Sequence, residues 1–400
     1  MTVVTAPLRL VRHTESVPWW RRMAFVTWTQ HKTAFVSLVL STIGIVITML
    51  AVGQPAHAAF AAYARAGCTT NHPTNVATCI AEQSALNTDD ALLNVLLVAL
   101  RGFPLLVGMF LGAPLLAKEF ETGTFRFAWT QGIGRVRWLT AKLALLGAAT
   151  ALCAFATSLA IVWWCDPFNG IGFASRWQPG EFDMSSVTLP AWILLSLALG
   201  VCAGAFVRRV LPAMAITMAL LAGAILVDFF WLNHWLLGLG ARTYEVVATR
   251  VNAVAVGALN TFAFPTHSPS GPIGSWLVSG WLTSSSGRRL STPTAHVVLS
   301  RAATATQTST EKNALANWLL QHHYQYWLSY QPAGRYWIFQ AVEGGALALT
   351  ALLIVALAVW AIDRPHPSRA RSKARHRAQT MVRRTRDPAG PLTLIRRSGR

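Results

Sequence analysis

Charged residues are scarce in this chain of 400 residues. They make up 12%, about half of the roughly 25% typical of soluble domains, while hydrophobic residues reach 53%. This composition excludes an ordinary soluble enzyme.

Negatively charged residues are scarcer than positively charged ones, with 15 Asp and Glu against 34 Lys and Arg. In a soluble chain such a balance would suggest nucleic-acid binding, but no aromatic residue lies among the arginines of the tail, as a base-stacking surface requires. We therefore expect no nucleic-acid partner.

Motifs for hydrolysis and for metal binding are also missing. The chain has five lysines, and none follows a GxxxxGK[ST] loop, so it has no phosphate-binding loop with which to hydrolyse ATP alone. HExxH and GxSxG are absent, and no Cys or His spacing is typical of a zinc site. We expect no catalytic residue, no metal and no cofactor in this chain, which disfavours an integral membrane enzyme.

Long apolar runs dominate what is present. Six of them can cross a bilayer as helices, which takes about 20 residues each. They cover residues 33–52, 91–117, 138–164, 188–207, 210–237 and 336–362. The sequence therefore predicts an all-α integral membrane protein with six transmembrane helices. Only Arg208 and Arg209 separate the fourth run from the fifth, which predicts a tight antiparallel hairpin.

The distribution of Lys and Arg predicts the orientation, because short cytoplasmic loops retain positive charge. Residues 1–32, residues 118–142, the Arg208–Arg209 pair and the tail from residue 363 hold 24 of them, whereas the loops 53–90 and 165–187 hold one each. Both termini are therefore predicted to be cytoplasmic. The predicted segments are a cytoplasmic leader with an interfacial helix (1–32), transmembrane helices 1–5 (33–237), a large extracytoplasmic segment (238–335), helix 6 (336–362) and a basic cytoplasmic tail beside anionic lipid (363–400).

Cysteine is rare as well, with five residues. Cys68 and Cys79 share the first outer loop, in a compartment that permits disulfides. We predict a bridge between them, with two free thiols as the alternative. In the large outer segment, residues 311–330 have helical spacing, which predicts an aromatic helix. That helix either lies on the outer membrane surface or caps a pathway between helices.

Three ionisable residues lie deep inside the apolar runs, at least six residues from the nearer end, where charge is costly and usually faces a partner or a cavity. They are Arg101, Asp228 and Glu343. At 1.5 Å per helical residue, all three lie roughly 10 to 14 Å below the outer surface. We hypothesise that Arg101 pairs with Asp228 or Glu343 in an intramembrane polar layer that borders a translocation pathway. The alternative is an ion pair that only holds the helices together.

Small residues and prolines mark special positions in these runs. Two GxxxG motifs, Gly108–Gly112 and Gly200–Gly204, predict close helix contacts and offer weak support for a dimer. Pro104 and Pro114 predict kinks in the second run, because each removes a backbone hydrogen bond. A kinked helix with a polar layer favours a moving part over a static anchor.

The inner link between the second and third runs, Ala117–Leu143, carries the most information. It begins with acids, breaks at Gly123, crosses an aromatic strip and ends with basic residues, a pattern typical of a segment along the inner interface. Its order of Glu, one residue, Gly-Thr, an aromatic strip, a turn, Arg and Lys resembles the loop in permease subunits of bacterial type-2 ABC exporters. The stretches TWTQHKTA (27–34), GAPLLAKE (112–119) and YQPAGRYWIFQAVE (330–343) are also similar to that family.

The resemblance implies a permease without its own motor in a bacterial plasma membrane. Two six-helix units, either two copies or a copy and a homologue, would form the pathway, and separate ATP-binding subunits carrying ATP and Mg²⁺ would dock beneath. Within the link 118–137, the residues implied in coupling to the ATPase are Glu119, Glu121, Gly123, Thr124, Arg135 and Arg137.

Other interpretations stay open. A non-transporting membrane sensor or an immunity-type protein would lack an ATPase partner. A motor-independent transporter usually has more spans and internal symmetry, and no repeat relates the first three runs to the last three. No motif identifies the exported substrate.

Overall fold

The computed structural model describes residues 19–68, 76–125, 134–171, 176–177, 179–228, 239–245, 275–306 and 314–363. Among these residues, six helices are long and apolar enough to cross a membrane. They are Met23–Arg65, Ala77–Thr122, Arg135–Asn169, Thr188–Val207, Val210–Val227 and Ala333–Asp363. The predicted six spans are thereby confirmed as six candidate membrane helices, several of which extend well beyond the apolar runs.

Helices occupy most of the described chain, and strands occur only between the fifth and sixth spans. In chain order, the elements are α1 (Trp19–Arg65), α2 (Val76–Leu100), α3 (Phe103–Val107), the π-helical turn η1 (Gly108–Gly112), α4 (Ala113–Thr122), α6 (Arg135–Ile171), α7 (Pro179–Met184), α8 (Thr188–Val207), α9 (Val210–Val227), β1 (Arg242–Glu245), β2 (Trp276–Thr283), α12 (Thr292–Thr306), α13 (Ala314–Gln321), β3 (Gln325–Gln331), the 3₁₀ turn η4 (Ala333–Arg335) and α14 (Tyr336–Asp363).

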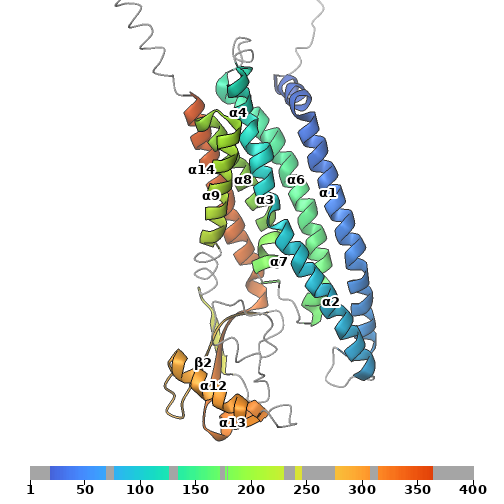
Figure 1. Ribbon diagram of the computed structural model, residues 1–400, viewed down its shortest axis with the longest axis vertical. Coiled ribbons are helices and arrows are strands. Elements are labelled where there is room, and N and C mark those ends of the chain that lie inside the picture. The colour runs from blue at the N-terminus through green and yellow to red at the C-terminus, as the bar shows by residue number, and fades with distance from the viewer. Residues whose placement is uncertain are drawn as a thin grey trace, which may run out of the picture.

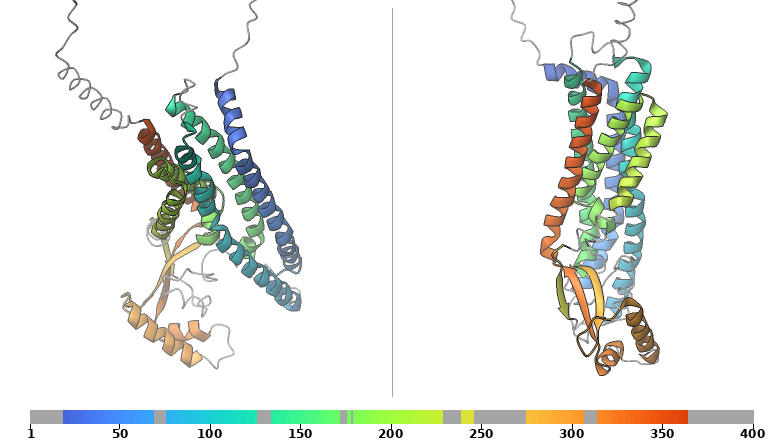
Figure 2. Two further views of the ribbon diagram at one scale, coloured as in Figure 1. Left: turned by 45° about the horizontal axis from the view of Figure 1, so that its top comes forward. Right: turned by 90° about the vertical axis from the view of Figure 1, so that its left-hand side faces the viewer.

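Helix α8 forms the centre of the bundle. Of the 18 most apolar consecutive residues of α8, 67% are buried inside the protein, whereas the corresponding share for α9 is 17%. It packs against α14, α6, α4 and α9, while α1 packs along α6 (Figures 1 and 2). The outer helices expose large apolar side chains, such as Leu152, Leu211 and Leu352. Such surfaces suit lipid tails, which are as apolar as leucine.

The second span is interrupted twice, each time just before a proline. Arg101 and Gly102 form a turn between α2 and α3, because Pro104 has no backbone N–H to donate and its ring would clash with the carbonyl of Leu100 in a continuous helix. The π-helical turn η1 precedes Pro114, which lacks the backbone donor of a regular helix. The span changes direction between α2 and α3 (Figure 2). The prolines thus account for both irregularities.

The two GxxxG motifs face each other within the chain. A Cβ added to Gly112 would lie 2.8 Å from the carbonyl oxygen of Leu197, and one added to Gly204 would lie 2.6 Å from that of Ala113. Helix α8 therefore touches η1 and α4 backbone to backbone. Because this contact uses both motifs inside one chain, they give no support to a dimer.

Helix α1 bends at His31, whose φ of −118° and ψ of 15° are not helical. The turns before the bend cross one end of the bundle, as the blue segment at the top of the right-hand view of Figure 2 shows. Met23 and Thr27 in these turns are buried, whereas Phe25 and Trp28 are exposed. The described part of the leader, residues 19–31, is therefore a distinct part of α1 that rests on the bundle through one face, and its position at the membrane interface stays a prediction.

The segment between the fifth and sixth spans contains an antiparallel sheet in the order β1-β3-β2. Thr243 lies opposite Ser329, and Trp281 lies opposite Trp327. Residues of the sheet and of α12 and α13 form a small core of their own, which includes Leu282, Leu299, Leu319 and Leu328. This sheet corrects the all-α prediction.

The helix predicted over residues 311–330 is wrong in its second half. Helix α13 ends at Gln321 and β3 begins at Gln325, after His323 takes the left-handed φ of 59°. The strand is rich in aromatic residues, which favour strands. The helical spacing of its apolar residues can be read from the segment itself. The pairing of β3 with β1 and β2 depends on residues far away in the sequence and cannot be read from it.

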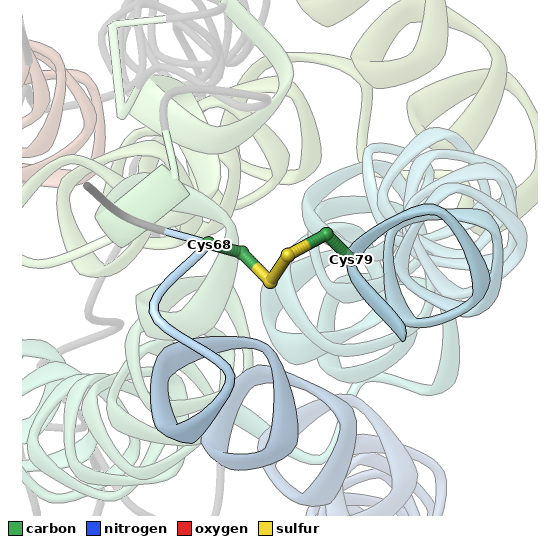
Figure 3. The surroundings of a disulfide bond; sticks show 2 residues. All are labelled: Cys68 and Cys79. Carbon is green, nitrogen blue, oxygen red and sulfur yellow. A yellow bond between two sulfur atoms is a disulfide. The ribbon is translucent and has the colours of Figure 1, made fainter. Parts of the chain in front are cut away.

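A disulfide joins Cys68, just after α1, to Cys79 in the first turns of α2 (Figure 3). It ties together the ends of the first two long helices, beside the end of the bundle that carries the sheet (Figure 1). The alternative of two free thiols does not describe this structure.

The contact between α8 and the second span predicts which glycines tolerate a methyl group. We expect Gly200→Ala to lower the melting temperature of the purified protein, because its Cβ would lie 2.6 Å from the amide nitrogen of Ala113, and overpacking against backbone costs about 1 to 3 kcal/mol. Gly223→Ala is the matched control, since nothing lies within 4 Å of its Cβ. Equal melting of the two variants would contradict this packing.

Candidate functional site

Four ionisable groups meet at the end of the bundle nearer the sheet. Arg101 comes from the turn between α2 and α3, Asp183 from α7, Asp228 from the residue after α9, and Glu343 from α14. One carboxylate oxygen of each acid lies within 4.8 Å of the others. The Nη2 atom of Arg101 lies 3.7 Å from Oδ2 of Asp183. We refer to Asp183, Asp228 and Glu343 as the acidic cluster.

The cluster includes one residue that the sequence analysis missed. Asp228 and Glu343 lie together as predicted members of one layer, but the ion pair of Arg101 is with Asp183, not with Asp228 or Glu343 as hypothesised. Asp183 belongs to a stretch that reads as an outer loop. Acids are rare in this chain, with 15 in all, and this rarity was the sequence signal that could have drawn attention to Asp183. Only the fold of α7 shows that Asp183 lies beside α14.

Two members of the acidic cluster are deeply buried, the side chain of Asp183 is 15% exposed, and the cluster is incompletely satisfied. Asp228 is 6% exposed and Glu343 is 3% exposed. In the described part of the chain, four side-chain atoms of this site are buried without a hydrogen-bond partner, namely Arg101 Nε, Asp183 Oδ1, Asp228 Oδ1 and Glu343 Oε1. Burial, reinforced by the nearby Asp228, raises the pKa of Asp183, which lies outside the six spans. Unpartnered buried carboxylates are unfavourable, so the cluster is not explained by packing alone.

A polar face of α14 holds α7 in place beside the cluster. Gln340 lies one turn before Glu343, and its Nε2 donates to the carbonyl oxygen of Phe182 at 2.9 Å. Its Oε1 accepts from Oγ1 of Thr188 at 2.9 Å. The hydroxyl groups of Tyr336 and Ser185 lie 2.7 Å apart. These bonds fix the helix turn that carries Asp183 against the helix that carries Glu343.

A second buried charge lies at the opposite end of the bundle. Lys142 of α6 is fully buried, forms an ion pair with Glu119 of α4, and lies 4.6 Å from the ring centroid of Trp138. This pair joins α4 to α6. Glu119 was implied in contact with an ATPase, but its carboxylate is engaged within the chain.

Two further implied coupling residues also have internal partners. Oε2 of Glu121 accepts a hydrogen bond from the amide of Val210 at 3.1 Å, which satisfies a free donor in the first turn of α9. Nη1 of Arg135 donates to the carbonyl oxygen of Ile362 at 3.4 Å. The ends of α4 and α9 are thereby joined, as are those of α6 and α14.

The remaining coupling candidates lie at the surface of this end. Gly123 ends α4 with a φ of 76°, a left-handed conformation that glycine adopts readily. Thr124 and Arg137 are exposed. The middle of the link, with Phe127 and Trp129 of its aromatic strip, lies outside the described residues.

A comparison with known protein families finds a match for about half of the chain. Residues 39–232 match the family model described as ABC-2 membrane transporter related. This stretch is related to the type-2 ABC transporter permeases. The match confirms the resemblance seen in the link and in GAPLLAKE (112–119), whereas the similar stretches 27–34 and 330–343 lie outside it. The match extends from α1 past α9, and it includes Arg101, Asp183 and Asp228 but not Glu343.

No curated protein and no solved structure matches this chain. The family is the membrane component of the transporter and not its ATPase. The functional assignment of this permease therefore depends on the family match and on the geometry of its two ends.

The pair between α4 and α6 predicts a large effect of a small change. We expect Glu119→Gln to destabilise the permease by about 3 to 5 kcal/mol, because it leaves the fully buried Lys142 unpaired. Thermal unfolding of the purified permease measures the loss. The double variant Glu119→Leu, Lys142→Met is expected to regain most of it, since it removes both charges.

Neutralising the exposed neighbour Lys118 by Lys118→Gln controls for the loss of one charge at this end and is expected to leave the melting temperature unchanged. A Glu119→Gln variant as stable as Lys118→Gln would rule out the buried pair as a stabilising contact.

Proposed function

We propose that this permease forms the membrane pathway of an ATP-driven exporter in a bacterial plasma membrane, powered by a separate ATP-binding subunit and completed by a second permease copy or a homologue. The family match over residues 39–232 carries the proposal. The geometry of the bundle supports it in three respects: the separation of its two ends, the connection of the link to the helices, and the position of the polar site.

The two ends of the bundle differ as the proposed orientation requires. The first turns of α1, the end of α4, the start of α6, the turn between α8 and α9 and the end of α14 lie at one end, and the sheet with α12 and α13 lies at the other (Figure 1). The described parts of the predicted cytoplasmic segments are therefore gathered at one end. This arrangement supports cytoplasmic termini and an extracytoplasmic sheet.

The link between α4 and α6 is connected to several helices at once. Glu119 bonds to α6, Glu121 bonds to α9, and Gly204 of α8 packs on the backbone of α4. A partner that displaces the end of α4 therefore acts on three other helices. We propose that Glu119 and Glu121 transmit this displacement inside the permease, whereas Gly123, Thr124 and Arg137 offer the surface that the ATPase contacts.

The second span continues from that surface to the polar site. Helix α4 leads through η1 and α3 to Arg101, which pairs with Asp183. A π-helical turn in such a position is a common feature of functional sites. One segment thus connects the proposed ATPase contact with the acidic cluster, which we propose borders the pathway.

The experiment that tests this function is capture of the ATPase. The tagged permease is purified in mild detergent, after crosslinking, from the membrane in which it is naturally made, and we expect an ATP-binding subunit to accompany it. Thr124→Arg is expected to reduce that subunit at least roughly tenfold, an effect of about 1.4 kcal/mol or more on binding, without lowering the melting temperature.

Ser286→Arg is a closely matched control at the opposite end. Both residues are exposed, and each hydroxyl lies close to the hydroxyl two residues earlier, at 3.1 Å for Thr124 and 2.8 Å for Ser286. Loss of the subunit in both variants would refute the assigned contact surface. Absence of any ATPase from the crosslinked wild type would favour a non-transporting sensor, an immunity-type protein or a motor-independent transporter.

A further inference from the structure

The acidic cluster has a shortage of positive charge and of hydrogen-bond donors. Among the described residues, Arg101 is the cation that forms an ion pair with it. When its three carboxylates are ionised, the group with Arg101 carries two negative charges. A buried site of this kind favours a bound cation, because uncompensated charge in a protein interior is costly.

The unpartnered oxygens point to a ligand independently of the charge count. Oδ1 of Asp228 and Oε1 of Glu343 have no hydrogen-bond partner, and both residues are more than nine-tenths buried. Oδ1 of Asp183 is also without a partner, although Oδ2 of the same carboxylate faces Arg101. Buried polar atoms in folded proteins are nearly always satisfied. Each of the three acids thus retains one oxygen for a ligand.

The spacing of the carboxylates suits a single hard metal ion. One oxygen from each acid lies within 4.8 Å of the other two. Oxygens that coordinate one Ca²⁺ at 2.3–2.6 Å lie at most about 5 Å apart. One ion can therefore contact all three carboxylates. Hard divalent cations prefer oxygen ligands of this type.

We infer that Asp183, Asp228 and Glu343 form a binding site for one hard divalent cation of the Ca²⁺ type. The ligands come from α7, from the end of α9 and from α14, so the ion joins three elements. Gln340 already fixes α7 on α14, whereas α9 is the least buried of the six spans. Binding therefore tethers the end of α9 to the other two elements. No local motif indicates such a site, because its ligands are far apart in the sequence, and the sequence alone predicts no metal.

Direct binding to the purified full chain tests the inference without any ATPase, so its outcome is separate from that of the proposed function. Chelator-treated protein in detergent is titrated with CaCl₂, while bound calcium and the melting temperature are measured. We expect one Ca²⁺ per chain and a rise in melting temperature with Ca²⁺, since a ligand of the native state stabilises it.

Three variants locate the site. Glu343→Gln and Asp228→Asn are each expected to weaken Ca²⁺ binding at least roughly tenfold, because even the loss of an outer-shell partner typically lowers metal affinity about 10- to 100-fold. In chelator, both are expected to melt no lower than the wild type, because each removes a charge from a buried cluster in which acids outnumber the paired cation. Asp363→Asn is the control: it removes one charge from the exposed far end of the same helix and should bind Ca²⁺ like the wild type.

Four results would overturn the inference. They are the absence of stoichiometric Ca²⁺ binding, an equal loss of binding in Asp363→Asn, unchanged binding in Glu343→Gln, and stabilisation by methylammonium but not by CaCl₂ at the same ionic strength. The last result would assign the cluster to an organic ammonium group.

Discussion

The backbone contact between α8 and the second span is the constraint on which the rest of the permease depends. Gly200 and Gly204 leave no side chain between α8 and the segment from η1 to α4, so the two helices cannot slide apart or together without breaking the packing. Small residues make such close approach possible in a membrane. Helix α8 also packs against α6, α9 and α14. A shift of the second span therefore shifts α8 and, through α8, these three helices.

The two ends of that span handle charge in different ways. At the link end, Lys142 and Glu119 form a closed pair, and removal of either partner leaves an unpaired buried charge. At the other end, the acidic cluster has more acids than cations and retains unpartnered oxygens. The Lys142–Glu119 pair balances its own charge and stabilises the packing of α4 on α6. The acidic cluster lacks a positive charge and hydrogen-bond donors, which a bound cation would supply. This difference is the physical reason to assign the link end to force transmission and the sheet end to a ligand.

The sequence predicted the features that are local or that a membrane enforces. The six spans, the hairpin at Arg208 and the irregularities near Pro104 follow from apolar length and from the missing donor of proline. Asp228 and Glu343 stood out because charge within an apolar run is rare. The features that it missed depend on long-range contacts. Asp183 reads as a loop acid until α7 folds onto α14.

The same limit explains the errors at the link and in the sheet. Glu119 and Glu121 have the types and spacing of surface acids, and only the fold shows that Lys142 and the amide of Val210 occupy them. The helix predicted through Tyr326 failed because helical spacing is a local signal, whereas the strands that pair with β3 are remote in the sequence. Residue type and spacing indicate which side chains can form ion pairs or hydrogen bonds. The packing of the helices decides which groups they bind.

If the second span connects the ATPase contact with the acidic cluster, as proposed, nucleotide binding to the ATPase displaces the elements around Asp183 and Asp228. Spin labels at Val187→Cys and Leu226→Cys, two exposed positions beside Asp183 and Asp228, allow the distance between these elements to be measured by pulsed electron paramagnetic resonance. With Mg²⁺ present throughout and the ATPase bound, we expect ATP to change this distance, and we expect no change when ATP is added to the isolated permease. An unchanged distance in the nucleotide-bound complex would contradict the account.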